Sequence, residues 1–259
     1  MEIIIVSLVA LFSSLLTFFS GFGLGTLLLP AFAFFFPLPV AVALTAVVHF
    51  CNNLFKTGLI FRHVNWKTVW SFGLFSVPAA VLGAFVLKIS GQPKPLLTYE
   101  LLGENHFVSL QGILIGVLMI FFASYEFFPF LETRIRPGKN LWLGGLISGF
   151  FGGLTGHQGA LRSAWLIRFL TEKQVYIATG TMIACLVDIS RLSIYWRDLQ
   201  KLNFEAQWQF LFFSALAAFS GALLGNKLLK KITLRSVKVV VCVLLLLFGL
   251  LTALGLLSK

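Results

Sequence analysis

Charged side chains are scarce in this sequence. Only 11% of the 259 residues are Asp, Glu, Lys or Arg, whereas 58% are hydrophobic. Soluble domains carry roughly 25% charged residues. Too few polar side chains therefore remain to cover a water-facing globule, and we expect a lipid bilayer to surround this chain.

Cysteine is scarce as well, and the motifs of common enzymes are missing. Cys51, Cys185 and Cys242 all lie within apolar segments, and their odd number and wide spacing indicate neither a disulfide framework nor a zinc site. The sequence contains no HExxH, P-loop or CxxC motif, and no nucleophile–base–acid set. We therefore expect no cofactor and no metal, and nothing in the sequence nominates an enzyme.

Acidic residues are the rarer charge, with 9 Asp and Glu against 20 Lys and Arg. The basic residues form short clusters between apolar runs, so we interpret them as determinants of membrane topology and contacts to lipid head groups. We expect no nucleic-acid partner. The first apolar run has no basic residue before it and no A-x-A-like site after it, which argues against a cleaved signal peptide.

Six apolar segments each approach the ~20 residues that a helix needs to cross a bilayer. They cover residues 40–60, 66–87, 107–128, 174–195, 204–229 and 237–257. None of them alternates with polar residues at period two, so we expect helices rather than strands. Two further apolar stretches, 3–36 and 141–170, are too long for one span, and each contains a glycine-rich break.

The glycine-rich breaks are the most informative feature of the chain. The first is Gly21-Phe22-Gly23-Leu24-Gly25, and the second runs over residues 149–159. A helix that restarts after such a break presents unpaired N–H groups and the positive end of its dipole. The arms of the second break, 141–151 and 160–170, have 11 residues each, or about 16 Å of helix. We expect re-entrant hairpins with tips near the membrane midplane, and two short full spans are the alternative.

The basic clusters predict the topology. The connection at 229–237 has five basic residues in and around it and no acidic one, so we place it in the cytoplasm. Counting back along the chain, every basic cluster lies inside only if 3–36 and 141–170 each enter and leave on the same side. This topology predicts a multi-pass protein of the cytoplasmic membrane with both termini outside.

The chain also contains an internal repeat. Three pairs of residues share an offset of 134 positions: Gly25 and Gly159, Thr45 and Thr179, Cys51 and Cys185. The two halves, 1–133 and 134–259, start on opposite sides of the membrane in the predicted topology. We therefore predict an all-α polytopic membrane protein of two inverted repeats, each a re-entrant hairpin followed by three transmembrane helices.

Residues near the breaks are the candidates for substrate binding. In the first half they are Gly23, Leu24, Gly25 and Thr26, with His49 and Asn52 from the following helix. In the second half they are His157, Gln158, Gly159 and Arg162. Arg162 offers a fixed fork of donors to an oxyanion, or else pairs with a carbonyl or with Asp188. His157 donates to the anion or relays a proton, or else holds the hairpin tip together with Gln158.

Asp188, Arg191 and Tyr195 share one face of a predicted helix. The first interpretation of Asp188 is an ion pair with Arg191 or Arg162 that fixes helix packing. The second is a carboxylate that couples transport to protons. We also expect His49, with Asn52 or Asn53, to face the first break.

With these residues in view, the sequence resembles the sulfite exporter TauE/SafE family. The resemblance lies in residues 21–30, in residues 149–162, and in the face formed by Asp188, Arg191 and Tyr195. The second half departs from the family pattern, because Ala164 stands where Pro30 would map. The resemblance implies transport of sulfite, sulfonates or related sulfur oxyanions without ATP.

The resulting hypothesis is a secondary transporter that exports a small sulfur oxyanion by alternating access at a midplane site. Its expected partners are the anion, coupled protons and the lipid bilayer, and the sequence does not specify an oligomeric state. The alternative is a passive anion channel or a membrane scaffold that transports nothing.

Overall fold

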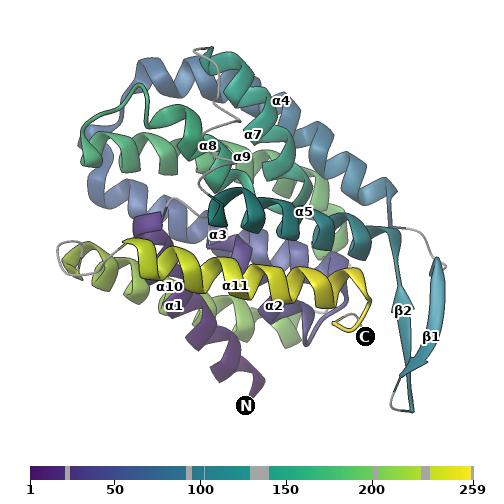
Figure 1. The fold of residues 1–259 in the computed structure, drawn as a ribbon. Coiled ribbons are helices and arrows are strands. Elements are labelled where there is room, and N and C mark those ends of the chain that lie inside the picture. Colours follow the sequence, from purple (N-terminus) through teal and green to yellow (C-terminus); the bar gives the residue numbers. More distant parts are fainter. Residues whose placement is uncertain are drawn as a thin grey trace.

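The computed structural model of the chain describes residues 1–20, 24–91, 95–101, 103–128, 140–200, 204–228 and 234–257 (Figure 1). Most of these residues are helical. The helices are α1 (Glu2–Ser20), α2 (Gly25–Ala33), α3 (Leu38–Ile60), α4 (Trp66–Ile89), α5 (Leu110–Phe127), α7 (Leu141–Thr155), α8 (Gln158–Leu166), α9 (Lys173–Gln200), α10 (Phe204–Leu228) and α11 (Leu234–Ala253), with a short 3-10 turn η1 (Phe61–His63).

Four helical segments of the described chain are long and apolar enough to cross a membrane. They are Leu38–His63, Trp66–Ile89, Lys173–Trp196 and Gln207–Gly225. Four shorter apolar helical segments accompany them: Glu2–Thr17, Leu110–Tyr125, Leu141–Thr155 and Val239–Ala253. The predicted class of a polytopic membrane protein is therefore confirmed.

Each stretch that was too long for one span consists of two helices. In the second stretch, α7 continues to Thr155 and α8 starts at Gln158, so the break is narrower than the predicted 149–159. Gly156 ends α7 in the left-handed conformation (φ 82°), and its N–H donates to Gly152 O at 2.9 Å. Glycine suits this position because a residue with a Cβ atom would be strained in the left-handed conformation. In the first stretch, residues 21–23 lie outside the described part of the chain.

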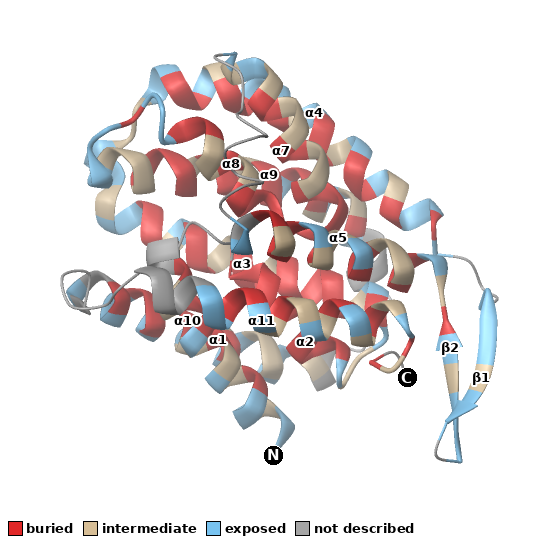
Figure 2. Ribbon diagram, in the orientation of Figure 1, coloured by how far each residue is buried: buried red, intermediate tan, exposed pale blue. Residues whose placement is uncertain are grey.

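The helix pairs connect the two halves of the chain. α1 packs against α10, α4 against α7, and α5 against α11, while α3 packs against α9. In the segments of α3 and α9 that could span a membrane, 61% of the most apolar window is buried, compared with 44% in α4 and 33% in α10. Figure 2 shows the same contrast between these central and outer helices. Polar groups on α3 and α9 are therefore held away from lipid.

Three glycines that the sequence assigned to the second hairpin serve the packing of α7 against α4. Gly145, Gly149 and Gly153 recur every four residues, and a Cβ at any of them would collide with the α4 backbone. The colliding groups belong to Phe72, Ser76 and Ala80. Small residues at this spacing let two membrane helices approach closely. The interpretation of Gly149 and Gly153 as part of the break is therefore wrong.

We expect Gly153→Ala to destabilise the protein. The new methyl group would overlap the carbonyl of Ala80 in α4, and such overpacking costs about 1–3 kcal/mol or more in the free energy of unfolding. Gly58→Ala is the matched control, because nothing lies within 4 Å of a Cβ at Gly58. Thermal unfolding in detergent should show a lower midpoint for Gly153→Ala and an unchanged or higher midpoint for Gly58→Ala. Equal midpoints for the two variants would contradict the close α4–α7 contact.

The fold contains one feature that the prediction of an all-α protein missed. Strands β1 (Leu97–Leu101) and β2 (Glu104–Val108) pair antiparallel, with Leu97 opposite Val108. This hairpin extends beyond the helices, beside the C-terminal end of α11 (Figure 1). The span predicted to begin at residue 107 starts at Leu110 instead, because the Ser109 side chain caps α5 by accepting from Gly112 N at 2.9 Å.

Candidate functional site

The N-terminal ends of α2 and α8 come together in the middle of the molecule. A Cβ placed on Gly25, the first residue of α2, would lie 3.9 Å from the carbonyl oxygen of Gly156 and 3.7 Å from Cδ2 of His49. Gly156 is two residues before α8. His49 lies 11 residues from each end of α3 (49 − 38 and 60 − 49). The two hairpin tips therefore meet at the midpoint of a central helix.

A buried ion cluster links α3 to α9 at this point. His49 Nδ1 lies 2.7 Å from Asp188 Oδ2, and the Asn53 amide donates to the same oxygen at 3.1 Å. The other carboxylate oxygen, Oδ1, accepts from Arg191 Nε at 3.0 Å and lies 2.9 Å from Nη2. All four side chains are buried. Of the partners considered for Asp188 from the sequence, the structure pairs it with Arg191.

Arg191 also connects this cluster to the second hairpin tip. A Cβ at Gly156 would lie 2.6 Å from Arg191 Nη1, so glycine gives the guanidinium its space. One turn along α9, the Tyr195 hydroxyl donates to Gly153 O in the last turn of α7 at 3.1 Å. α9 thus holds the end of α7 through two consecutive turns.

Arg162 lies one turn into α8. Its Nη1 donates to Gln158 Oε1 at 3.1 Å, and its Nε lies 3.5 Å from where a Cβ of Gly180 would be. Gln158 is neutral, and within the described ranges no carboxylate forms an ion pair with Arg162. The side chain is buried. Arg162 therefore brings an uncompensated positive charge into the interior.

Buried charge in the described residues is predominantly positive. Near the tips Arg162 and Arg191 are buried, and Asp188 is the carboxylate buried with them. A buried charge is costly unless a charge of opposite sign accompanies it. An anionic guest would offset the excess. This part of the interior is therefore chemically suited to bind a small anion.

Three buried polar groups near the tips have no hydrogen-bond partner in the described structure: Thr45 Oγ1, His157 Nε2 and Gln158 Nε2. The methyl group of Thr45 lies 3.4 Å from the Cβ position of Gly25. The other ring nitrogen of His157 contacts Thr155 Oγ1 at 2.9 Å, and the ring stacks on Phe122. Buried polar groups nearly always have partners, so these three are available to a ligand.

The remaining predicted residues fall into three groups. Leu24, Thr26 and Gly159 are buried at the starts of α2 and α8, whereas Gly23 lies outside the described residues. Asn52 faces away from Asp188. With its amide turned to satisfy both ends, it donates to Ser14 Oγ at 3.1 Å and to Ala218 O at 3.2 Å, and it accepts from Lys56 Nζ at 3.1 Å.

Asn53 and Thr45 are the residues of this site that the sequence did not select. Asn53 was one of two alternatives, and its spacing of four from His49 is the signal that places it on the same helix face. Thr45 was noted as part of the repeat, with two alternatives: it faces the pore, or it forms a hydrogen bond back to its own helix.

Comparison with known proteins gave one match. The family model described as sulfite exporter TauE/SafE matches residues 6–252 of the chain. No curated protein and no solved structure matched it.

Proposed function

Because the chain belongs to the sulfite exporter TauE/SafE family, a family of membrane transporters, we propose that it is a secondary transporter that exports a small sulfur oxyanion across the cytoplasmic membrane. Sulfite and sulfonates are the substrates that the family suggests. The observation that carries the proposal is the excess of buried positive charge where the two hairpin tips meet.

The proposed anion site lies between Gly25–Thr26 and His157–Arg162. Each side supplies the N-terminal end of a helix, where unpaired N–H groups and the helix dipole attract an anion. Arg162 adds a planar fork of donors, which matches the geometry of an oxyanion. The unpaired amide of Gln158 supplies a further donor, and His157 Nε2 donates when the imidazole carries a second proton, because Nδ1 already faces the carbonyl oxygen of Thr155. A sulfur oxyanion presents several acceptor oxygens to such a set of converging donors.

We propose alternating access by one inverted repeat rocking on the other. The pairing of helices supports this arrangement. In the repeat, α1 corresponds to α7, α3 to α9, α4 to α10 and α5 to α11. The α1–α10 contact therefore corresponds to the α7–α4 contact, and the α3–α9 and α5–α11 contacts each join two corresponding helices. Many secondary transporters follow this plan, with the substrate at the midplane. We place both termini and the β-hairpin outside. The basic residues Arg62, Lys67 and Arg168 lie just after α3, at the start of α4 and just after α8, which we place on the cytoplasmic side.

We further propose that Asp188, together with His49, exchanges the coupled proton. The pair is buried at the midpoint of α3, beside the first hairpin tip. Ionisable residues inside membranes often serve as proton relays. An imposed pH gradient across a liposome membrane should therefore change the rate of anion flux. A flux that ignores the gradient would exclude this role.

Sulfite flux into liposomes tests the proposed function. Purified protein reconstituted into liposomes should move sulfite at a rate that saturates with concentration, and empty liposomes provide the background. A rate that rises linearly and responds to no gradient would favour a passive channel. The absence of any flux above background, from protein that remains folded, would favour a membrane scaffold.

A further inference from the structure

A cavity with both polar and apolar lining residues lies at the end of the bundle that carries the β-hairpin. Its volume is about 240 Å³, and it is lined by Pro39, Val42, Leu87, Lys88, Gly91, Gln111 and Tyr195. Gly91 follows the end of α4 and Gln111 lies in the first turn of α5, so the helix ends next to the β-hairpin border the cavity. The cavity is separate from the hairpin tips.

Two helix faces lead from this cavity to the anion site. On α3, the residues in order of depth are Val42, Thr45 and His49; on α9, they are Tyr195, Arg191 and Asp188. Residues three or four apart lie on the same helix face, and each step covers about 5 Å along the axis. Val42 and Tyr195 line the cavity. The next turn of each helix carries a group next to a hairpin tip, namely Thr45 beside Gly25 and Arg191 beside Gly156.

Tyr195 lines the cavity and lies one turn of α9 away from Arg191. The side chain is buried, and its hydroxyl donates to Gly153 O at 3.1 Å. This hydrogen bond joins α9 to the last turn of α7, just before the second tip. A movement of the α7–α8 hairpin relative to α9 would break it.

One basic side chain, Lys88, lines the cavity. Lys88 Nζ donates to the carbonyl oxygen of Ile194, the residue before Tyr195, at 3.3 Å. The ammonium group of Lys88 therefore lies beside Tyr195. A positive group at the mouth of a narrow cavity raises the local concentration of anions.

We propose that this cavity is the outer vestibule of the anion path and that Tyr195 is its gate. The proposal rests on the proposed function, because it names the route by which the anion would leave the tips. While the Tyr195 hydroxyl is bonded to Gly153 O, the side chain closes the cavity toward the hairpin tips. When the hydroxyl is released, the anion can pass from the level of Val42 to that of Thr45. The ligand class is the small oxyanion of the proposed function, which would pass Lys88 on this route.

Accessibility of introduced cysteines to a membrane-impermeant thiol reagent tests the gate. The background is the chain with its native cysteines replaced: Cys51→Ala, Cys185→Ala and Cys242→Ala. Val42→Cys reports on the cavity, Thr45→Cys on the turn below it, and Thr98→Cys on the exposed β-hairpin. Val42→Cys should react from the same side of the liposome as Thr98→Cys. Thr45→Cys should react slowly with Tyr195 in place and at least about tenfold faster with Tyr195→Ala.

Tyr195→Phe is the conservative variant, since it keeps the ring and removes only the hydroxyl. It should speed the reaction of Thr45→Cys about fivefold, the effect of losing one hydrogen bond, and this comparison decides the question if Tyr195→Ala fails to fold. An equal rate for Thr45→Cys with and without the Tyr195 hydroxyl would overturn the gate, and an unreactive Val42→Cys would overturn the vestibule. Labelling requires no sulfite, so protein that passes this test but moves no sulfite would refute the proposed function alone.

Discussion

Arg162→Ala should abolish sulfite flux while the protein remains folded. Arg162 donates to the neutral Gln158 amide, and among the described residues it has no carboxylate partner. Removing one member of a buried, hydrogen-bonded charge pair costs about 2–5 kcal/mol in binding, so the apparent affinity for sulfite should fall roughly 30-fold or more. Stability should not fall, because the substitution removes a buried positive charge that lacks an opposite charge.

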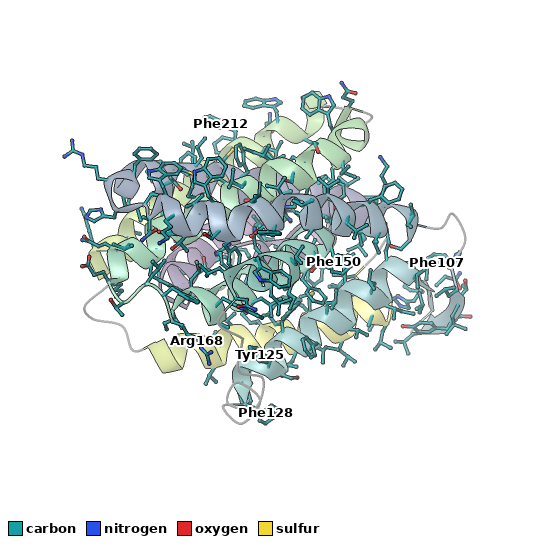
Figure 3. The ribbon with its side chains drawn as sticks, turned by 90° about the horizontal axis from the view of Figure 1, so that it is seen from above. Phe107, Tyr125, Phe128, Phe150, Arg168 and Phe212 are labelled. Atoms are coloured by element: carbon teal, nitrogen blue, oxygen red, sulfur yellow. The ribbon has the colours of Figure 1, made fainter. Side chains whose placement is uncertain are left out.

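Two further variants make this test specific. Arg162→Lys keeps the charge but loses the planar fork, so it should retain weakened transport. Arg168→Ala removes the same charge from an exposed position six residues away, at the edge of the bundle (Figure 3). It should transport like the unmodified protein. If Arg162→Ala transports normally, Arg162 does not bind the anion.

Asp188→Asn should be the most destabilising substitution in the centre of the protein. The asparagine preserves the shape of the side chain but leaves the Arg191 guanidinium buried without an opposite charge, while His49 loses a carboxylate partner at 2.7 Å. Breaking a buried ion pair by neutralising one partner costs about 3–5 kcal/mol. Thermal unfolding in detergent should show a much lower midpoint.

The double variant Asp188→Asn with Arg191→Gln is the control, because it removes both charges together. Replacing a buried ion pair as a unit costs much less than breaking it, so the double variant should recover a large part of the lost stability. If Asp188→Asn unfolds at the same temperature as the unmodified protein, or if the double variant recovers nothing, the cluster does not hold α3 to α9.

These two predictions differ in their effect on stability although both substitutions remove a buried charge. Asp188 is surrounded by donors from His49, Asn53 and Arg191, whereas Arg162 has a neutral acceptor. The contrast separates a residue that maintains the fold from one that is available to a ligand. A comparison of flux and unfolding for both variants therefore assigns each residue its role.

The sequence was informative about helices because a membrane restricts the choice of structure. In lipid every backbone polar group must be satisfied internally, so apolar segments near 20 residues long predict helices, and their ends lie close to those of α3, α4, α9 and α10. The β-hairpin was missed because all of it except Phe107 and Val108 lies outside the long apolar runs. These two residues pair with β1 and do not belong to the helix that was predicted to begin at residue 107.

Glycine was harder to interpret because the same residue serves packing and helix breaks. Gly149 and Gly153 follow the four-residue spacing of a packing face, but their partners Ser76 and Ala80 lie about 70 positions away in the sequence. Only Gly156 has the backbone conformation of a break within the described part of α7 and α8. Spacing alone does not distinguish these roles.

The sequence alone could predict only some of the contacts within the cluster around Asp188. The spacing of three between Asp188 and Arg191 favoured their ion pair, which the structure contains. His49 is 139 positions from Asp188, so only the packing of α3 on α9 brings them together. The choice between Asn52 and Asn53 depends on the rotation of α3. That rotation turns Asn53 toward Asp188 and Asn52 toward Ser14.

The central claim is that two hairpin tips form one anion site in the middle of the membrane. Crystals grown with selenite, which has the shape and charge of sulfite, test it directly through the anomalous scattering of selenium. We predict a peak within hydrogen-bond distance of the first amides of α2 and α8 and of the Arg162 guanidinium. Selenium bound only at the surface, with the space between Gly25 and Arg162 filled by protein, would contradict the claim.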